Sequence, residues 1–240
     1  MKIAIFTMTR DRIDYTKRTF KALKETAGMD YDHYVLDNGS KDGTREWLKT
    51  QSFAGLFFSP DNKGLWQGIN TILTETKFFE GYDLVLKLDN DVEFPHKNWL
   101  KDMVEAYKKL GANWIVSPFV EGVCNGEGGA PRLEMCVEEG VTVGRSAHVG
   151  GMCMLTSADN YSEMFPNLDL SSGWDYFFCT SSHCRSGYIE DIHVKHMDTS
   201  EGQEETNPDY YNRKIEESKI IYKGDVNNYA GIHTNGDNTK

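Results

Sequence analysis

The chain has 240 residues, of which 39% are hydrophobic and 12% aromatic, and its formal net charge at pH 7 is -11. A chain of this length buries one sizeable core, which favours one catalytic domain with a small extension over two full domains. The negative net charge argues against non-specific binding of nucleic acid, because neutralising phosphates requires a basic surface. No apolar run approaches the roughly 20 residues that cross a bilayer, and Met1–Met8 is too short for a signal peptide. We therefore expect a cytoplasmic protein.

The cysteines and the charge distribution indicate which kinds of site the protein can contain. The five cysteines are odd in number and form no CxxC pair, which favours reduced thiols over a disulfide framework or a zinc site.

Residues 10–24 contain six basic side chains, whereas Asp198–Glu217 is strongly acidic. We interpret the basic segment as a solvated helix face, and the alternative is a patch for a polyanion or for peripheral contact with a membrane.

The first part of the chain alternates between two hydrophobic patterns. Short apolar runs predict strands, and each is followed by a stretch with helical periodicity. Strands are predicted at Ile3–Phe6, His33–Leu36, Leu56–Phe58 and Leu84–Leu88, and helices at Tyr15–Thr26, around Trp47–Leu48 and at Leu65–Phe79. This alternation predicts an α/β fold with a mostly parallel central sheet, helices on both faces and ligands at the carboxyl ends of the strands.

The pattern changes after the apolar run Trp114–Ser117. Gly122–Gly140 is rich in glycine and acidic residues and predicts a hairpin or a mobile loop that could cover a substrate. Further elements are predicted as a strand at Val149–Leu155, a helix near Gly173–Arg185, a strand at Tyr188–His196 and a helix around Tyr210–Tyr222, with a disordered end from Gly231. We therefore divide the chain into a catalytic domain, residues 1–200, and a helical extension with a flexible tail, residues 201–240.

The sequence Leu-Asp-Asn-Asp, Leu88–Asp91, ends one of the predicted strands. Two carboxylates separated by one residue, the DXD pattern, can approach one hard cation together and leave positions open for pyrophosphate oxygens. The alternative is an ordinary turn, because turns favour Asp and Asn.

A second polar turn follows the predicted strand that ends near Leu36. Within Val35–Thr44, Asp37 can accept hydrogen bonds from a nucleobase. The alternative is a plain connection from strand to helix, with Asp42 or Thr44 capping the next helix.

Four segments together resemble the inverting glycosyltransferases of family 2, in that family's order: Phe6–Arg12, Val35–Thr44, Asn62–Asn70 and Leu88–Asp91. Gly150–Leu155 is similar to the strand that lines the acceptor side in that family, and Gly173–Cys179, leading to Arg185–Tyr188, is similar to its following helix and turn. The resemblance covers roughly the first 200 residues. It implies the A-type (GT-A) fold and transfer of a hexose from a nucleoside diphosphate sugar, with uridine as the expected base.

The resemblance also implies the residues of the donor site. Asp37 is expected at the nucleobase, Asp89 and Asp91 at the ribose and the metal-bound diphosphate, and Mn²⁺ or Mg²⁺ as the cation. His196 is expected as a further metal ligand, with His193 as the alternative. The remaining residues expected to bind the donor are Thr7, Thr9, Arg10, Arg12, Asn62, Gly64 and Asn90.

On the acceptor side, the resemblance makes Asp175 the catalytic base, which takes the proton of the attacking hydroxyl. The alternative for Asp175 is a carboxylate that only stabilises the start of a helix. Gly151 and Trp174 are expected to line the acceptor site. Trp174 stands where the family usually has an acidic residue, so it either stacks on a sugar or packs in the core. The acceptor is expected to be a glycan, a lipid-linked molecule or another hydroxyl compound.

Two other functions compete with this interpretation. A nucleotidyltransferase also combines an α/β sheet with carboxylates, but it requires a glycine-rich phosphate loop, and Thr7–Arg12 contains no glycine. The second competing function is a module that binds a nucleotide sugar without turnover. Trp174 in place of the acidic residue is the feature that favours it.

Overall fold

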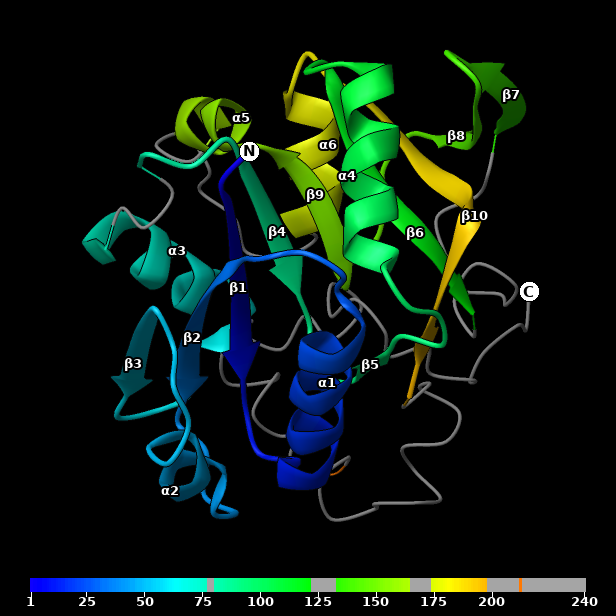
Figure 1. The fold of residues 1–240 in the computed structure, drawn as a ribbon. Coiled ribbons are helices and arrows are strands. Elements are labelled where there is room, and N and C mark those ends of the chain that lie inside the picture. The colour runs from blue at the N-terminus through cyan, green and yellow to red at the C-terminus, as the bar shows by residue number, and fades with distance from the viewer. Residues whose placement is uncertain (77–79, 122–132, 165–173, 198–211, 213–240) are drawn as a thin grey trace, which may run out of the picture.

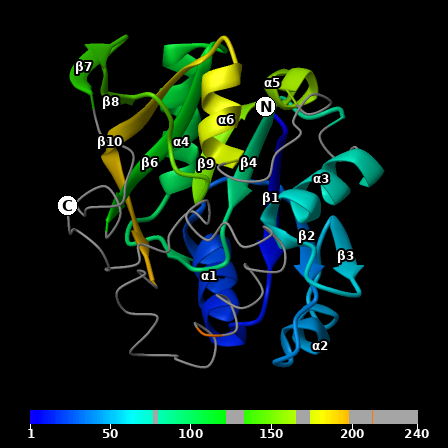
Figure 2. The same ribbon diagram turned by 180° about the vertical axis from the view of Figure 1, so that it is seen from behind.

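A mixed β-sheet runs through the described part of the chain, with helices on both of its faces (Figure 1). The structure is a computed structural model that describes residues 1–76, 80–121, 133–164, 174–197 and 212. Helices α1 and α4 cover one face, and α3, α5 and α6 cover the other, as the view from behind shows (Figure 2). The predicted α/β fold with a central sheet flanked by helices is therefore confirmed.

The strands of the sheet are ordered β3-β2-β1-β4-β9-β6-β10-β8-β7, and β5 pairs with β10. Strands β3, β2, β1 and β4 form a continuous parallel half. Strand β9 runs antiparallel between β4 and β6, and β6 is parallel to β10. The bounds are β1 Ile3–Thr9, β2 Asp32–Asn38, β3 Gly55–Ser59, β4 Leu84–Leu88, β5 Val92–Glu93, β6 Trp114–Glu121, β7 Glu134–Glu138, β8 Val141–Ser146, β9 Cys153–Ser157 and β10 Arg185–His196.

Alternation along the central strands divides the core between the two faces. Ile3 and Ile5 of β1 pack into the cluster under α1 and α4, whereas Ala4 and Phe6 pack into the cluster on the opposite face. Because successive strand residues point to opposite faces, a strand covered on both faces reads as a continuous apolar run. This is why β1 and β4 were recognisable from the sequence.

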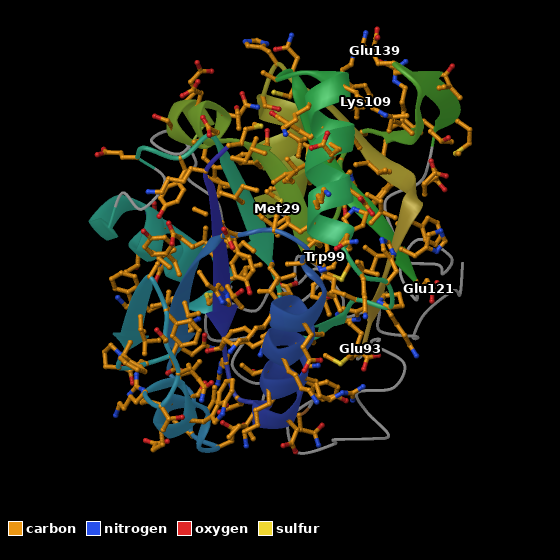
Figure 3. All side chains as sticks on the ribbon, viewed as in Figure 1. Met29, Glu93, Trp99, Lys109, Glu121 and Glu139 are labelled. Atoms are coloured by element: carbon orange, nitrogen blue, oxygen red, sulfur yellow. The ribbon has the colours of Figure 1, made fainter. Side chains whose placement is uncertain are left out.

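The helices each bury one side. In α1, Thr16, Thr19, Phe20 and Leu23 are buried, which is the spacing of one helical face. In α4, Trp99, which is labelled in Figure 3, is buried. It stacks on Phe94, with ring centroids 4.1 Å apart. The bounds are α1 Ile13–Thr26, α2 Thr44–Leu48, α3 Gly64–Thr76, α4 Trp99–Leu110, α5 Ala158–Met164 and α6 Trp174–Ser181.

Several elements differ from the prediction. Strand β9 begins at Cys153 instead of Val149, because Gly150 and Gly151 lie in the turn before it. Strand β10 begins at Arg185, three residues before the predicted Tyr188. The structure also adds four elements that were not predicted, namely α4, α5, β5 and β8.

The described end of the predicted Gly122–Gly140 hairpin or loop forms a hairpin. Strand β7 pairs antiparallel with β8, and Glu139, labelled in Figure 3, lies at the tip of this hairpin. Glu139 and Gly140 both have positive φ angles. Residues 122–132 and nearly all of the predicted extension, including the helix at Tyr210–Tyr222, lie outside the described residues.

The basic segment predicted on α1 is partly neutralised by acidic neighbours. Arg12 pairs with Asp91, and Arg18 pairs with Glu93 of β5. Among the described residues, Cys136, Cys153, Cys179 and Cys184 are free thiols, as predicted. None of the described helices is both long and apolar enough to span a membrane.

Candidate active site

The loops that follow β1 and β2 are tied together by hydrogen bonds. The backbone N–H of Asp11 donates to Ser40 Oγ at 2.7 Å, and the N–H of Lys41 donates to Asp11 Oδ1 at 2.6 Å. The N–H of Ile13, at the start of α1, donates to Asp42 Oδ2 at 2.8 Å. Burial raises the pKa of Asp42, but hydrogen bonds from Thr44 and Ile13 outweigh it and lower the pKa. These contacts hold Asp11 and Arg12 at the carboxyl end of β1. Both residues have positive φ angles, which are uncommon for residues other than glycine.

Asp37, the last but one residue of β2, is fully buried. Its Oδ1 accepts hydrogen bonds from Ser40 N at 3.2 Å and from Arg45 Nε at 3.1 Å. Thr9 Oγ1 lies 3.4 Å from its Oδ2. The expected donor residues Thr9 and Asp37 are therefore brought together, and Arg45, which was not predicted, joins them.

Asn38, Asn62 and Gly64 form a second polar cluster beside this carboxylate. Asn38 Nδ2 donates to Asn62 Oδ1 at 3.0 Å and to the carbonyl of Gly64 at 3.1 Å. Asn62 Oδ1 also accepts from Gly64 N at 2.9 Å. The predicted residues Asn62 and Gly64 thus hold the start of α3 against the end of β2.

Asp91 lies between two basic side chains. Its Oδ2 is 2.9 Å from Arg12 Nη1 and 3.2 Å from His196 Nε2. Burial raises the pKa of Asp91, but the hydrogen bond and charge of His196, together with Arg12, lower it well below its usual range. Burial lowers the pKa of His196, but the hydrogen bond and charge of Asp91 outweigh this and raise it. Three predicted residues therefore meet at one point: Arg12 immediately before α1, Asp91 in the loop after β4 and His196 at the end of β10.

Asp89 has a different environment from Asp91. Its side chain is 30% exposed and pairs with Lys87 Nζ, from a lysine that is buried inside β4. Burial raises the pKa of Asp89, and the nearby charge of Asp91 adds to the rise, while Lys87 opposes it. Asn90 turns away, because its Nδ2 donates to Thr16 Oγ1 of α1 at 2.8 Å. Within this segment, Asp91 contacts two of the other predicted site residues, Arg12 and His196, whereas the printed partner of the Asp89 carboxylate is Lys87.

The acceptor-side residues meet at the start of α6. The N–H of Gly151 donates to Asp175 Oδ2 at 3.0 Å, and the N–H of Tyr176 donates to Asp175 Oδ1 at 2.9 Å. The hydroxyl of Tyr188 accepts from Gly150 N at 3.1 Å. The backbone N–H of Asp89, an expected donor-side residue, donates to the carbonyl of Met152 at 2.8 Å. One short segment, residues 150–152, therefore contacts both the expected base, Asp175, and the backbone of Asp89.

Some side chains around Asp91 have atoms of the type that bind a divalent cation. Within the described ranges, no group of three or more His, Cys, Asp or Glu side chains is placed so that it could hold a metal ion. However, Asp91 Oδ1 and His196 Nδ1 are buried and have no hydrogen-bond partner among those residues. Two carboxylates and an imidazole are a suitable donor set for Mn²⁺. Asp91 and His196 therefore offer buried atoms to an ion, and Asp89 is the further candidate ligand in the same loop.

The other predicted residues lie at or beside this edge with different surroundings. Thr7 is buried, with its Oγ1 3.0 Å from His33 Nε2. Arg10 lies in the turn after β1, and Trp174 is the first residue of α6. His193, the alternative metal ligand, contacts Glu121 and the carbonyl of Glu190, so it is His196 that lies beside Asp91.

Three residues of the site were not predicted. Lys87 could have been noticed as a charge inside the apolar run Leu84–Leu88. Arg45 and Tyr188 carry no such signal, because only the fold brings Arg45 to Asp37 and Tyr188 to Gly150.

Solved structures share this fold at low sequence identity. A mannosyltransferase, PcManGT from Pyrobaculum calidifontis in complex with GDP-Man and Mn²⁺, is 15% identical with a TM-score of 0.60, covering 82% of this chain and 56% of its own. TarS 1-349 of S. aureus in complex with UDP-GlcNAc is also 15% identical with a TM-score of 0.60, covering 82% of this chain and 60% of its own. GalNAc-T7 with UDP, GalNAc and Mn²⁺ is 13% identical with a TM-score of 0.62, covering 82% of this chain and 44% of its own.

The chain therefore spans roughly half the length of these glycosyltransferases, and the likeness confirms the predicted GT-A fold. No curated protein matches the sequence. The model of glycosyl transferase family 2 matches residues 4–155, which is more than half of the chain and includes Asp37, Asp89, Asp91 and Gly151. The chain belongs to glycosyl transferase family 2.

Proposed function

We propose that this chain transfers a sugar from a nucleoside diphosphate sugar, with uridine as the base, to an acceptor hydroxyl with inversion at the anomeric carbon. The observation that supports this most directly is the link through residues 150–152. Asp89 N binds the carbonyl of Met152, and Gly151 N binds the Asp175 carboxylate. Donor and acceptor groups anchored to one segment are held in a fixed relation, which is what a direct displacement requires.

Asp175 is the proposed general base. A carboxylate has about four lone-pair sites, so the two backbone N–H groups leave room for an acceptor hydroxyl. As the hydroxyl oxygen attacks the anomeric carbon, its proton moves to Asp175, and the bond between that carbon and the diphosphate oxygen breaks. A positioned base of this kind typically contributes 10²–10⁴ in rate, on the order of the loss expected when it is removed.

The diphosphate side is proposed to lie at Asp89, Asp91, Arg12 and His196. The left-handed backbone at Arg12 and the contact with Asp91 fix its guanidinium at the end of the parallel half of the sheet. A divalent cation held by Asp89, Asp91 and His196 would stabilise negative charge on the leaving diphosphate. Lys87 pairs with Asp89 from within the sheet, so its charge competes with a cation for this carboxylate.

Release of nucleoside diphosphate tests the proposal. The purified chain is incubated with UDP-glucose, UDP-N-acetylglucosamine or GDP-mannose, with Mn²⁺ and with or without glycan and lipid-linked acceptors. We expect release that depends on the cation and rises with one class of acceptor. The product anomer, determined by NMR, should have the configuration opposite to that of the donor. Product with retained configuration contradicts inversion, and full activity in excess chelator contradicts the cation.

A module that binds nucleotide sugars without turnover is the second candidate. It is favoured by Asp175, because each of its carboxylate oxygens already accepts a backbone N–H, as in a purely structural helix start. Tight donor binding in calorimetry, combined with no diphosphate release for any acceptor, would establish this second function.

A further inference from the structure

An aromatic ring is exposed directly beside the proposed base. Tyr176 follows Asp175 in the first turn of α6, and it is 47% exposed. Phe178, two residues later, is fully buried and packs on Tyr161, whereas Thr180, one turn after Tyr176, is exposed as well. Tyr176 therefore lies on the outer side of the helix, where it adds little to the core.

His148 holds this ring in place. The ring centroids of His148 and Tyr176 are 5.3 Å apart and the ring planes meet at 77°, which is an edge-to-face arrangement. His148 lies between β8 and β9, in the same stretch of chain as Gly151, whose N–H donates to the carboxylate of Asp175. Two consecutive residues of α6 are thus held by the segment 148–151, one through its carboxylate and the other through its ring.

The carboxylate and the ring are close enough to contact one ligand together. The Cα atoms of consecutive residues are about 3.8 Å apart. Because Asp175 and Tyr176 both contact the segment 148–151, their side chains leave α6 toward the same side. A molecule of the size of a sugar ring, with one hydroxyl on Asp175, therefore also covers the ring of Tyr176.

This pair of groups has the chemistry of a carbohydrate site. A pyranose has hydroxyls around its rim and C–H groups on its faces, and the partly positive C–H groups are attracted to the negative face of an aromatic ring. A phosphate is disfavoured here, since Asp175 is itself an anion and, among the described residues, only backbone N–H groups contact its carboxylate. The basic side chains of the site contact the other carboxylates instead, Arg12 and His196 at Asp91 and Lys87 at Asp89.

We infer that Tyr176 is the surface on which the sugar ring of an uncharged glycan acceptor packs while one of its hydroxyls lies on Asp175. His148 is a positioning residue, because it acts through the ring of Tyr176. The inference rests on the proposed function. It narrows the acceptor from hydroxyl compounds in general to a neutral pyranoside, either a free glycan or the terminal sugar of a glycoconjugate.

Saturation-transfer NMR of the whole chain tests the binding step without requiring turnover. The probes are methyl glycosides and disaccharides of glucose, galactose, mannose and N-acetylglucosamine, added in the presence of UDP or GDP. We expect at least one neutral sugar to bind, and its phosphate monoester to bind several-fold more weakly. Tighter binding of the phosphate monoester, or no binding of any neutral sugar, overturns the inference.

Two substitutions of Tyr176 separate the ring from the rest of the side chain. Tyr176→Ala should weaken binding of the neutral sugar about tenfold, the effect of losing one aromatic contact and its apolar area. Tyr176→Phe keeps the ring and should bind as well as the unaltered chain. Met135→Ala is the matched control, because it removes another large exposed apolar side chain, on β7. Unchanged sugar binding in folded Tyr176→Ala, with thermal unfolding as the check on folding, contradicts the site.

His148 is tested by loss and rescue. His148→Ala removes the ring that holds Tyr176 and should weaken sugar binding several-fold, whereas His148→Phe restores an aromatic contact and should recover most of the affinity. Equal binding in all three proteins would show that His148 does not position Tyr176.

Steady-state release of nucleoside diphosphate distinguishes a failure of this inference from a failure of the proposed function. With the preferred nucleotide sugar, Tyr176→Ala should raise the KM for the neutral acceptor about tenfold and leave the KM for the donor unchanged. Transfer to a phosphorylated lipid alone, unaffected by Tyr176→Ala, overturns the inference while the proposed function stands. Sugar binding that depends on Tyr176, without release for any acceptor, supports the sugar site and contradicts the proposed function.

Discussion

The Nε2 of His196 lies 3.2 Å from the carboxylate of Asp91, which joins the last described strand to the loop after β4. Arg12 contacts the same carboxylate oxygen from the start of α1. Asp91 is therefore at once a candidate metal ligand and the anion that neutralises two buried basic groups.

Replacing Asp91 by Ala should abolish cation-dependent donor binding and also destabilise the fold. The side chains of Arg12 and Asp91 are 7% and 8% exposed, so the variant leaves buried positive charge without its partner. Breaking such a pair costs about 3–5 kcal/mol. Urea denaturation measures the loss, and calorimetry with Mn²⁺ and donor measures binding. Asp91→Asn, which keeps the size, should lose cation dependence with a smaller loss of stability, and Mn²⁺ binding as tight as in the unaltered chain would exclude Asp91 as a ligand.

The His196–Asp91 pair should make stability depend on pH in the metal-free protein. The pKa of His196 is raised above its usual 6.5, so its contribution is complete below that value and is lost as pH rises through the folded pKa. The pKa of Asp91 is lowered below its usual 3.8, so its contribution is complete above that value and is lost as pH falls through the folded pKa. The free energy of unfolding from this pair should be greatest between about pH 4 and about pH 6.5 and decline at higher pH.

Urea titrations in chelator, from about pH 5 to about pH 9, would measure this decline. His196→Gln is the control and should flatten the profile, because it removes the titrating ring. A profile that is the same in both proteins would show that His196 does not couple to Asp91.

Lys87→Met should increase the affinity for a divalent cation. Lys87 is 2% exposed and forms an ion pair with Asp89, so it competes with any cation for the same carboxylate. Removing a charge at this distance is expected to tighten Mn²⁺ binding by about tenfold, and Met fills most of the lysine volume in the sheet. Calorimetric titration with Mn²⁺ provides the measurement, with Lys101→Met at an exposed position of α4 as the matched control. Weaker binding would mean that Lys87 holds Asp89 in its binding position.

Asp175→Asn should separate donor binding from transfer. The amide oxygen can still accept one backbone N–H, but the side chain can no longer take a proton from the acceptor. We expect unchanged donor affinity and a loss of turnover of about a hundredfold or more. Steady-state kinetics together with donor titration checks this, and Asp159→Asn in the first turn of α5 is the control. Loss of donor binding along with turnover would assign Asp175 to the donor side, and an unchanged rate would direct attention to Glu190.

The sequence predicted the parallel half of the sheet well, because buried parallel strands are continuous apolar runs bounded by turns. It did not predict α4, although Trp99, Leu100, Met103 and Val104 have helical spacing. It placed the start of β9 too early, because the two glycines before Cys153 are small and apolar, and only the turn shows that they leave the strand.

For the site, the sequence indicated the carboxylates, and the family resemblance placed His196 with Asp91, which the structure brings within 3.2 Å of each other. Arg45, the partner of Asp37, was not predicted, because only the fold brings it there. Burial is also not readable from a motif. Asp37 is fully buried, with contacts from Thr9 at the end of β1 and from Ser40 in the loop after β2.

The position of β9 has a consequence for the growing chain on the ribosome. Strand β9 lies between β4 and β6, yet it is synthesised after both. Until Cys153–Ser157 has emerged, β4 has one open edge and β6 cannot join the sheet that contains β1. Open edges can pair with other chains. During synthesis there is therefore an interval in which β4, once formed, has an edge that can pair with other chains, and β9 closes this edge. The same segment of chain brings Gly151 and Met152 to Asp175 and Asp89.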